Sequence, residues 1–374
     1  MTTPHRSTAG RRLLGAGGLA IAAALTLASC ASSPSGGAEG SGGEGSLAVV
    51  ATTTQLADFA AIVGGDDIEL TGLLPAGGSA HHFDPTPADL LALGQADVLI
   101  VNGVELETFI DGAIEASGFD GEIITAADGI DLAEAEVITA EAEGAEAHDH
   151  EDHDHADHDH GDADEEHAHD DHAHDDDAHD HDHGPVNPHI WTSPRNASGM
   201  VEEIAVGLGE VDPEHADDYA QRAEAYFQQL GELDTWIAAQ FERVPAEERV
   251  LVSGHDSLRY YLHDYGITFA GSILPSFEDN AEPSAADIDE LVDAIREHGV
   301  KAVFVESSMS PKLAETIAKE AGIEVIDADA LYADSLGVEG SGADTYIGAT
   351  AHNTRVILEA WGATPDPLPG TLLE

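Results

Sequence analysis

Thirteen of the 22 histidines lie in one run of the sequence, mostly as pairs of the form His-x-His. They are His148, His150, His153, His155, His158, His160, His167, His169, His172, His174, His179, His181 and His183. Imidazole is the commonest side-chain ligand for zinc and other late divalent metals, so this composition indicates metal binding. A solubilising acidic linker is the alternative, but acidic residues alone would serve that purpose. We therefore interpret the run as an auxiliary metal-binding loop.

The sequence around these histidines predicts a disordered loop from about residue 141 to 185. This stretch contains no Lys, Arg or aromatic residue. It therefore has too little apolar surface to compensate for the entropy lost on ordering. Apolar runs flank it on both sides, which predicts an insertion into a folded chain.

Four further positions combine metal-ligand types with a suitable place in the chain. His81 follows a predicted strand, His255 comes directly after another, and Asp334 follows the last one. His189 precedes Trp191 and a predicted helix. Ligands of open α/β sheets bind outside the carboxyl ends of strands, so these side chains could share one metal ion. Taken singly, a histidine at a strand exit is more often a hydrogen-bonded loop residue than a ligand, and Asp334 could equally cap a turn.

The elements that must position these residues alternate between strands and helices. Strands are expected at 47–53, 68–74, 98–101, 250–253, 267–273, 302–305 and 324–326, and helices at 55–63, 87–95, 106–117, 194–208 and 344–361. Short apolar strands alternating with helices predict parallel sheets, hence an α/β fold. A longer helix over 213–241 would join two such lobes. We predict an N-terminal lobe over 47–211, the connecting helix within 212–243 and a C-terminal lobe over 244–374, with the metal site in the cleft between the lobes.

The N-terminus has the pattern of a secretion signal. Basic residues precede an apolar segment over 13–28, which is too short to span a bilayer comfortably. The segment ends in Leu27-Ala28-Ser29-Cys30, which resembles the lipobox of bacterial lipoproteins. We predict a signal peptide over 1–30, lipidation of Cys30 and a flexible tether over 31–46. Cys30 is the only cysteine, so no disulfide within the chain is possible.

The formal net charge of −61 excludes the usual nucleic-acid-binding proteins, which need clustered Lys and Arg. Outside residues 141–182, 54 acidic residues still face 13 basic ones. This balance suits a cationic ligand or a salty environment.

Five motifs between about residues 47 and 361 resemble the cluster A-I, TroA-like solute-binding proteins of zinc and manganese ABC importers. They are His81-His82-Phe83-Asp84-Pro85, Asn187-Pro188-His189-Ile190-Trp191, Gly254-His255-Asp256, Glu306-Ser307-Ser308-Met309-Ser310-Pro311 and Tyr332-Ala333-Asp334-Ser335-Leu336-Gly337. The resemblance implies His81, His189, His255 and Asp334 as ligands, with His81 rather than His82 in the family position. The chain departs from the family pattern at Ala80, His82, Asp84 and Asn187, and keeps all four ligand types.

The same resemblance implies a monomeric, lipid-anchored receptor on the outer face of the bacterial cytoplasmic membrane. It would capture Zn²⁺ and deliver it to the membrane permease of an ABC importer. Two other classes remain open at this point. Three histidines and a water also hold catalytic zinc, so a hydrolase with Asp334 or Glu306 as general base is one of them, although no His-Glu-x-x-His motif is present. The other is a manganese receptor, an adhesin or a metal sink that acts through the histidine-rich loop.

Overall fold

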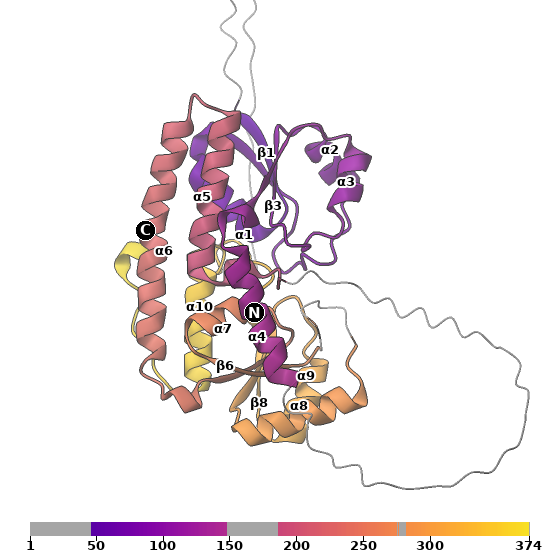
Figure 1. The fold of residues 1–374 in the computed structure, drawn as a ribbon, viewed down its shortest axis with the longest axis vertical. Coiled ribbons are helices and arrows are strands. Elements are labelled where there is room, and N and C mark those ends of the chain that lie inside the picture. Colours follow the sequence, from indigo (N-terminus) through magenta and orange to yellow (C-terminus); the bar gives the residue numbers. More distant parts are fainter. Residues whose placement is uncertain (1–45, 148–185, 275, 277–281, 374) are drawn as a thin grey trace, which may run out of the picture. The chain divides into compact units, whose positions relative to one another are not determined.

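Two four-stranded parallel sheets form the framework of the protein (Figure 1). The structure is a computed structural model that describes residues 46–147, 186–274, 276 and 282–373. The first sheet has the order β2-β1-β3-β4 and the second has the order β6-β5-β7-β8. The strands are β1 (Leu47–Ala51), β2 (Ile68–Gly72), β3 (Val98–Val101), β4 (Glu122–Thr125), β5 (Val250–Ser253), β6 (Thr268–Ser272), β7 (Ala302–Glu306) and β8 (Glu324–Leu331). The prediction of two α/β lobes with parallel sheets is confirmed.

The central strands are apolar on both faces, as parallel sheets between helices require. Every residue of β3, β5 and β7 is buried. In the first sheet, β1 pairs with both neighbours, and Val49 lies opposite Val98. The predicted bounds of β3 and β5 match the observed ones. Both strands are short runs that begin directly after a charged residue, Asp97 before β3 and Arg249 before β5.

Helices α1 (Thr54–Gly64), α2 (Pro87–Leu93) and α5 (Pro194–Val211) of the N-terminal lobe begin at capping side chains. The side chain of Thr53 accepts a hydrogen bond from the backbone of α1. Thr86 and Asp89 form a capping box at α2, with proline in the first turn. A further helix is α3 (Ile110–Ser117).

The long helix α6 (Ala216–Phe241) packs against α1 and α5 on one side and against α10 (Tyr346–Ala360) of the C-terminal lobe. It starts three residues later than the predicted Pro213. At 26 residues it is about 39 Å long, which suits a helix shared by both lobes. Its buried residues include Tyr219, Ala223 and Tyr226 in the predicted apolar stripe.

Several elements were missing from the sequence-based prediction. They are β4, α4 (Leu132–Ala147), α7 (Arg259–Asp264), α8 (Ala285–His298) and α9 (Lys312–Ala321). Short 3-10 turns complete the fold as η1 (Gly65–Asp67), η2 (Ala126–Gly129), η4 (Ile190–Thr192), η5 (Ala246–Glu248) and η6 (Gly370–Leu372). Apolar residues at 288, 291, 292 and 295 give α8 ordinary amphipathic spacing, which could have identified it.

Helix α4 corrects the predicted start of the disordered loop. The prediction placed disorder from about residue 141, whereas the helix continues to Ala147. Residues 141–147 are mostly alanine and glutamate, which are strong helix formers, and low apolar content does not prevent them from extending an existing helix. Helix α4 also contacts α7 of the C-terminal lobe, although it precedes α5 in the chain. The loop histidines from 148 to 183, the signal peptide and Cys30 lie outside the described residues.

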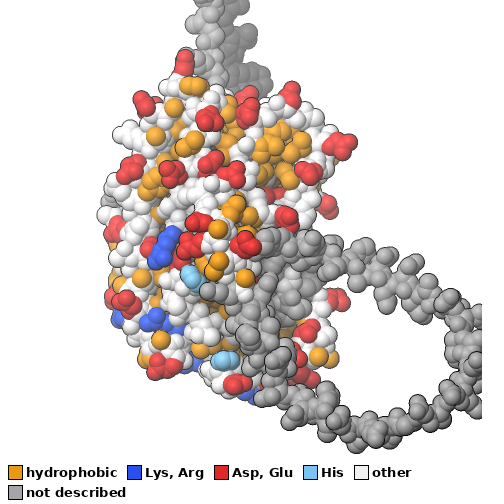
Figure 2. Space-filling model, in the orientation of Figure 1, with side chains coloured by type: hydrophobic (Ala, Val, Ile, Leu, Met, Phe, Trp, Pro, Cys, Tyr) orange, Lys and Arg blue, Asp and Glu red, His pale blue; other side chains and the backbone are white. Residues whose placement is uncertain are grey.

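Carboxylates are spread over the face of the molecule seen in Figure 2, with only a few Lys and Arg side chains between them. No described helix combines the length and the apolar composition needed to cross a membrane.

Candidate metal site

His81 lies in the loop that follows β2. Its backbone N–H donates to Ser79 Oγ at 3.2 Å, and its carbonyl accepts from Thr108 Oγ1 at 3.3 Å. The side chain is buried, whereas the neighbouring His82 is exposed. The loop therefore directs only one of the two consecutive histidines into the protein.

His189 precedes η4 and is oriented by the side chain of Asn187. Asn187 Oδ1 accepts from the backbone N–H of His189 at 3.1 Å and lies 2.9 Å from its Nδ1. This contact places the ring proton on Nδ1 and leaves the lone pair of Nε2 free to bind a metal ion. The other end of Asn187 donates to the Asp256 carbonyl at 2.7 Å, next to His255. Asn187 thus connects two of the candidate ligands.

His255 follows β5 after one residue, Gly254, and lies against the buried carboxylate of Glu306 at the end of β7. Its Nδ1 is 3.5 Å from Glu306 Oε1. Glu306 is itself fixed, because it accepts from Gly254 N at 3.0 Å and from Ser257 Oγ at 2.8 Å. A side chain at Gly254 would collide with this carboxylate, so the close approach requires glycine. Glu306 therefore orients His255 from behind rather than joining the ligand cluster.

Asp334 follows β8 in a loop that both lobes hold in place. The side chain of Asn353 on α10 bonds both backbone groups of Tyr332 at 2.8 Å. From the N-terminal lobe, Gln55 Nε2 and Trp191 Nε1 donate to the Ala333 carbonyl at 3.1 and 2.9 Å. The position of Asp334 thus depends on contacts from three distant parts of the chain.

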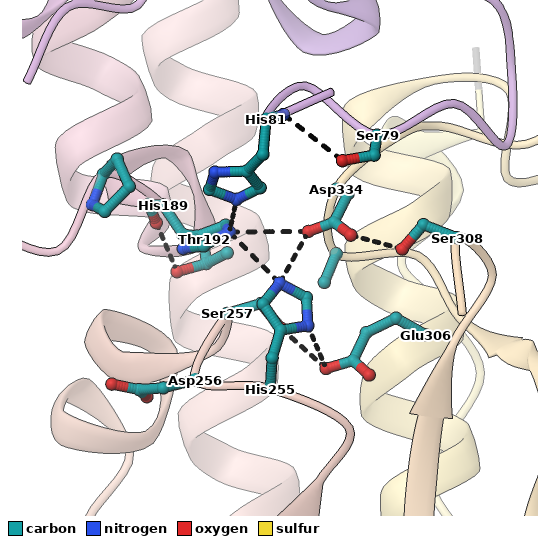
Figure 3. Close-up of polar contacts among 12 residues, drawn as sticks. Ser79, His81, His189, Thr192, His255, Asp256, Ser257, Glu306, Ser308 and Asp334 are labelled. Atoms are coloured by element: carbon teal, nitrogen blue, oxygen red, sulfur yellow. Dashed lines mark hydrogen bonds and ion pairs between the residues drawn. The ribbon is translucent and has the colours of Figure 1, made fainter. Parts of the chain in front are cut away.

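The four predicted ligands come together in one cluster, in which their side chains point toward one another (Figure 3). One ligand atom from each residue lies within 4.8 Å of all the others. His189 Nε2 is 3.1 Å from His81 Nε2 and 3.3 Å from His255 Nε2, and Asp334 Oδ1 is 3.1 Å from His255 Nε2. Bonds of about 2.0–2.1 Å to a tetrahedral zinc ion would separate the donor atoms by about 3.3 Å. The observed distances fit a small four-coordinate ion.

All four side chains are at most 3 % exposed, and this burial shapes their proton affinities. Burial lowers the pKa of His81 to about 3 and also lowers that of His189. Burial alone would lower the pKa of His255, but the carboxylates of Asp334 and Glu306 outweigh it and raise that pKa. Burial alone would raise the pKa of Asp334, but the adjacent imidazoles of His255 and His189 hold it well below its usual range. The site therefore favours one positive charge beside Asp334, which a cation can supply in place of a proton.

Sequence reasoning missed the residues that hold the ligands. Asn187 stood out only as a departure from the family pattern, and Glu306 only as a possible base. The hydroxyl of Ser308 donates to Asp334 Oδ2, and Gln55 supports the same loop from 278 residues away. No local pattern marks such long-range partners.

Comparisons with known proteins match most of the chain to metal-binding proteins. The family model described as "ZnuA: Zinc-uptake complex component A periplasmic" matches residues 49–360. A manganese-binding lipoprotein, MntA of Halalkalibacterium halodurans, is 29 % identical over 330 residues, covering 88 % of this chain and 92 % of the relative. The zinc-binding protein TroA of Treponema pallidum is 27 % identical over 327 residues, covering 87 % and 92 %. The solved structure of that TroA protein aligns with a TM-score of 0.67 at 24 % identity, covering 85 % of this chain and 99 % of the other.

These matches decide between the receptor and the hydrolase hypotheses. The matched relatives are named as binding proteins and substrate-binding lipoproteins of transporters, so the protein is a receptor and not an enzyme. Because the family match covers most of the chain, the protein belongs to the ZnuA family of metal-binding receptors of ABC transporters.

Proposed function

We propose that this protein is an extracytoplasmic receptor that captures Zn²⁺ and delivers it to the permease of an ABC importer. The observation that carries the proposal is the convergence of His81, His189, His255 and Asp334 within 4.8 Å. Two of these ligands precede α6 in the chain and two follow it, so a movement between the lobes would separate them. Such a site suits capture and release better than a fixed catalytic frame.

The choice of zinc rests on the ligand set, because the names of the relatives differ. MntA of Halalkalibacterium halodurans is named for manganese, YfeA of Yersinia pestis for iron and TroA of Treponema pallidum for zinc. Three imidazoles and one carboxylate make a borderline-soft site of low coordination number, which suits zinc. Manganese prefers more oxygen ligands and a higher coordination number, so a manganese receptor is the second candidate.

The histidine-rich loop is proposed as an auxiliary element that binds several metal ions weakly. Deleting residues 147–184 should leave the fold and one tight zinc site intact, while removing weak sites that prefer Zn²⁺, Cu²⁺ or Ni²⁺. The weak binding of the full chain should disappear below about pH 6, because the imidazoles become protonated. Isothermal titration calorimetry with zinc measures both classes of site.

A matched control keeps the loop length and replaces its thirteen histidines by asparagine. It should behave like the deletion if the imidazoles carry the weak binding. Equal zinc stoichiometry with and without the loop contradicts the auxiliary role. Absence of one tight site in the loop-deleted, folded protein contradicts the receptor proposal itself.

The N-terminus is proposed as a lipid anchor that begins at Cys30 after removal of the residues that precede this cysteine. The Cys30→Ser variant should appear as soluble protein in the medium rather than in the membrane fraction, because no thiol remains to carry the lipid. Ser29→Ala serves as a control and should stay with the membrane. Mass spectrometry that finds Cys30 intact and unmodified in membrane-bound protein contradicts the anchor.

A further inference from the structure

The two carboxylate oxygens of Asp334 have different surroundings (Figure 3). Oδ2 accepts a hydrogen bond from the hydroxyl of Ser308. Among the described residues, Oδ1 is buried without a hydrogen-bond partner, and it lies 3.4 Å from His189 Nε2 and 3.1 Å from His255 Nε2. One oxygen therefore faces the imidazole cluster, and the other is held on the opposite side.

Ser308 is itself held in a tight turn at the end of β7. The backbone N–H of Ser307 donates to the Leu331 carbonyl at 3.0 Å, which ties this turn to the end of β8. The N–H of Met309 donates to the Glu306 carbonyl at 3.0 Å and closes the turn around Ser308. The hydroxyl therefore approaches Asp334 from a fixed position.

This asymmetry limits how Asp334 can bind a metal ion. A bidentate carboxylate must turn both oxygens toward the ion, and doing so here would move Oδ2 away from the Ser308 hydroxyl. With one oxygen from Asp334 and one nitrogen from each histidine, the ion receives four donors. Zinc accepts four donors in tetrahedral geometry, whereas manganese favours six and prefers oxygen.

We propose that Ser308 is a specificity-determining residue, which keeps Asp334 monodentate and thereby favours Zn²⁺ over Mn²⁺. The proposal rests on the proposed function, in which the four clustered residues bind a divalent ion. Removing the hydroxyl frees Oδ2 to become a fifth donor. Manganese gains from this additional oxygen, while zinc mainly loses the orientation of its carboxylate ligand.

The test compares Ser308→Ala with two other variants of the full chain. Ser307→Ala is the matched control, because the Ser307 hydroxyl is buried and has no hydrogen-bond partner in the described part of the chain. Ser308→Thr keeps a hydroxyl and should restore the original behaviour. Competition binding of Zn²⁺ and Mn²⁺ at less than one metal equivalent, where the tightest site fills first, should show a Zn²⁺/Mn²⁺ affinity ratio about tenfold lower in Ser308→Ala alone.

A purely structural role for Ser308 would weaken both metals in parallel. An unchanged ratio in Ser308→Ala, or an equal change in Ser307→Ala, overturns the proposal. Co²⁺ provides a test that needs no variant, because four-coordinate Co²⁺ absorbs visible light much more strongly than six-coordinate Co²⁺. The native chain should give the intense spectrum, and a weak spectrum with stoichiometric binding overturns the proposal. Failure of the native chain to bind any divalent ion tightly refutes the proposed function instead.

Discussion

Alanine in place of His189 is expected to weaken Zn²⁺ binding on the order of a thousandfold, because the ion loses one of only four ligands. The same direction is expected for His81→Ala and His255→Ala. His189 should show the largest loss, since its Nε2 lies within 3.3 Å of both other ligand nitrogens. Competition with a chromophoric zinc chelator measures these affinities, and circular dichroism checks that each variant folds.

His82→Ala is the matched control for the His81 variant. It removes the same side chain one residue away, from an exposed position outside the cluster. Its effect on the tight site should be less than about threefold. A damaging His82 substitution together with a silent His81 substitution would falsify the assignment of the first ligand.

The native site is expected to prefer Zn²⁺ over Mn²⁺ at least about a hundredfold, or about 2.7 kcal/mol. Among divalent metal ions ordered by their affinity for a given site, zinc lies near the strong end and manganese at the weak end. The three imidazoles widen this difference in affinity. Competition binding on the loop-deleted protein is the proper measurement, because the loop histidines would otherwise take up zinc. Comparable affinities for both ions would require withdrawal of the zinc assignment.

His255 is the position at which this preference can be changed. The His255→Glu variant should lose zinc affinity and narrow the gap, since a second carboxylate adds negative charge and favours the harder ion. The carboxylate of the neighbouring Glu306 will repel the new negative charge in the metal-free protein. The stability of the site should therefore depend more strongly on a bound cation. His298→Glu makes the same charge change at an exposed position and should leave the ratio unaltered.

The predicted part of the site comes from local features of the sequence. His255 and Asp334 could be found because each lies close behind a strand, and the strand-exit rule places such residues together. The family motifs then selected His81 over His82. The supporting contacts were beyond reach, because Asn187 and Asp256, or Gln55 and Ala333, become neighbours only when the lobes pack.

The missed elements have equally specific causes. The edge strand β4 is short, and Ile123 within it is half exposed, so it lacks the continuous apolar run that marked β3 and β5. The composition of residues 141–147 resembles that of the acidic loop beyond them, although alanine and glutamate also favour helix. Composition therefore locates the boundary between the folded chain and the loop only to within one or two helical turns.

The burial of the candidate ligands affects the rate of metal exchange. An ion coordinated by side chains that are at most 3 % exposed has no path to solvent past rigid walls. The hydrogen bonds from Gln55 and Trp191 to the Ala333 carbonyl must break before the Asp334 loop can move away from the N-terminal lobe. Dissociation of the ion is then a first-order process. The half-life of the bound state is set by the rate at which the lobes open rather than by the concentration of a competing acceptor. Delivery to a membrane partner would on this basis require that partner to hold the lobes apart.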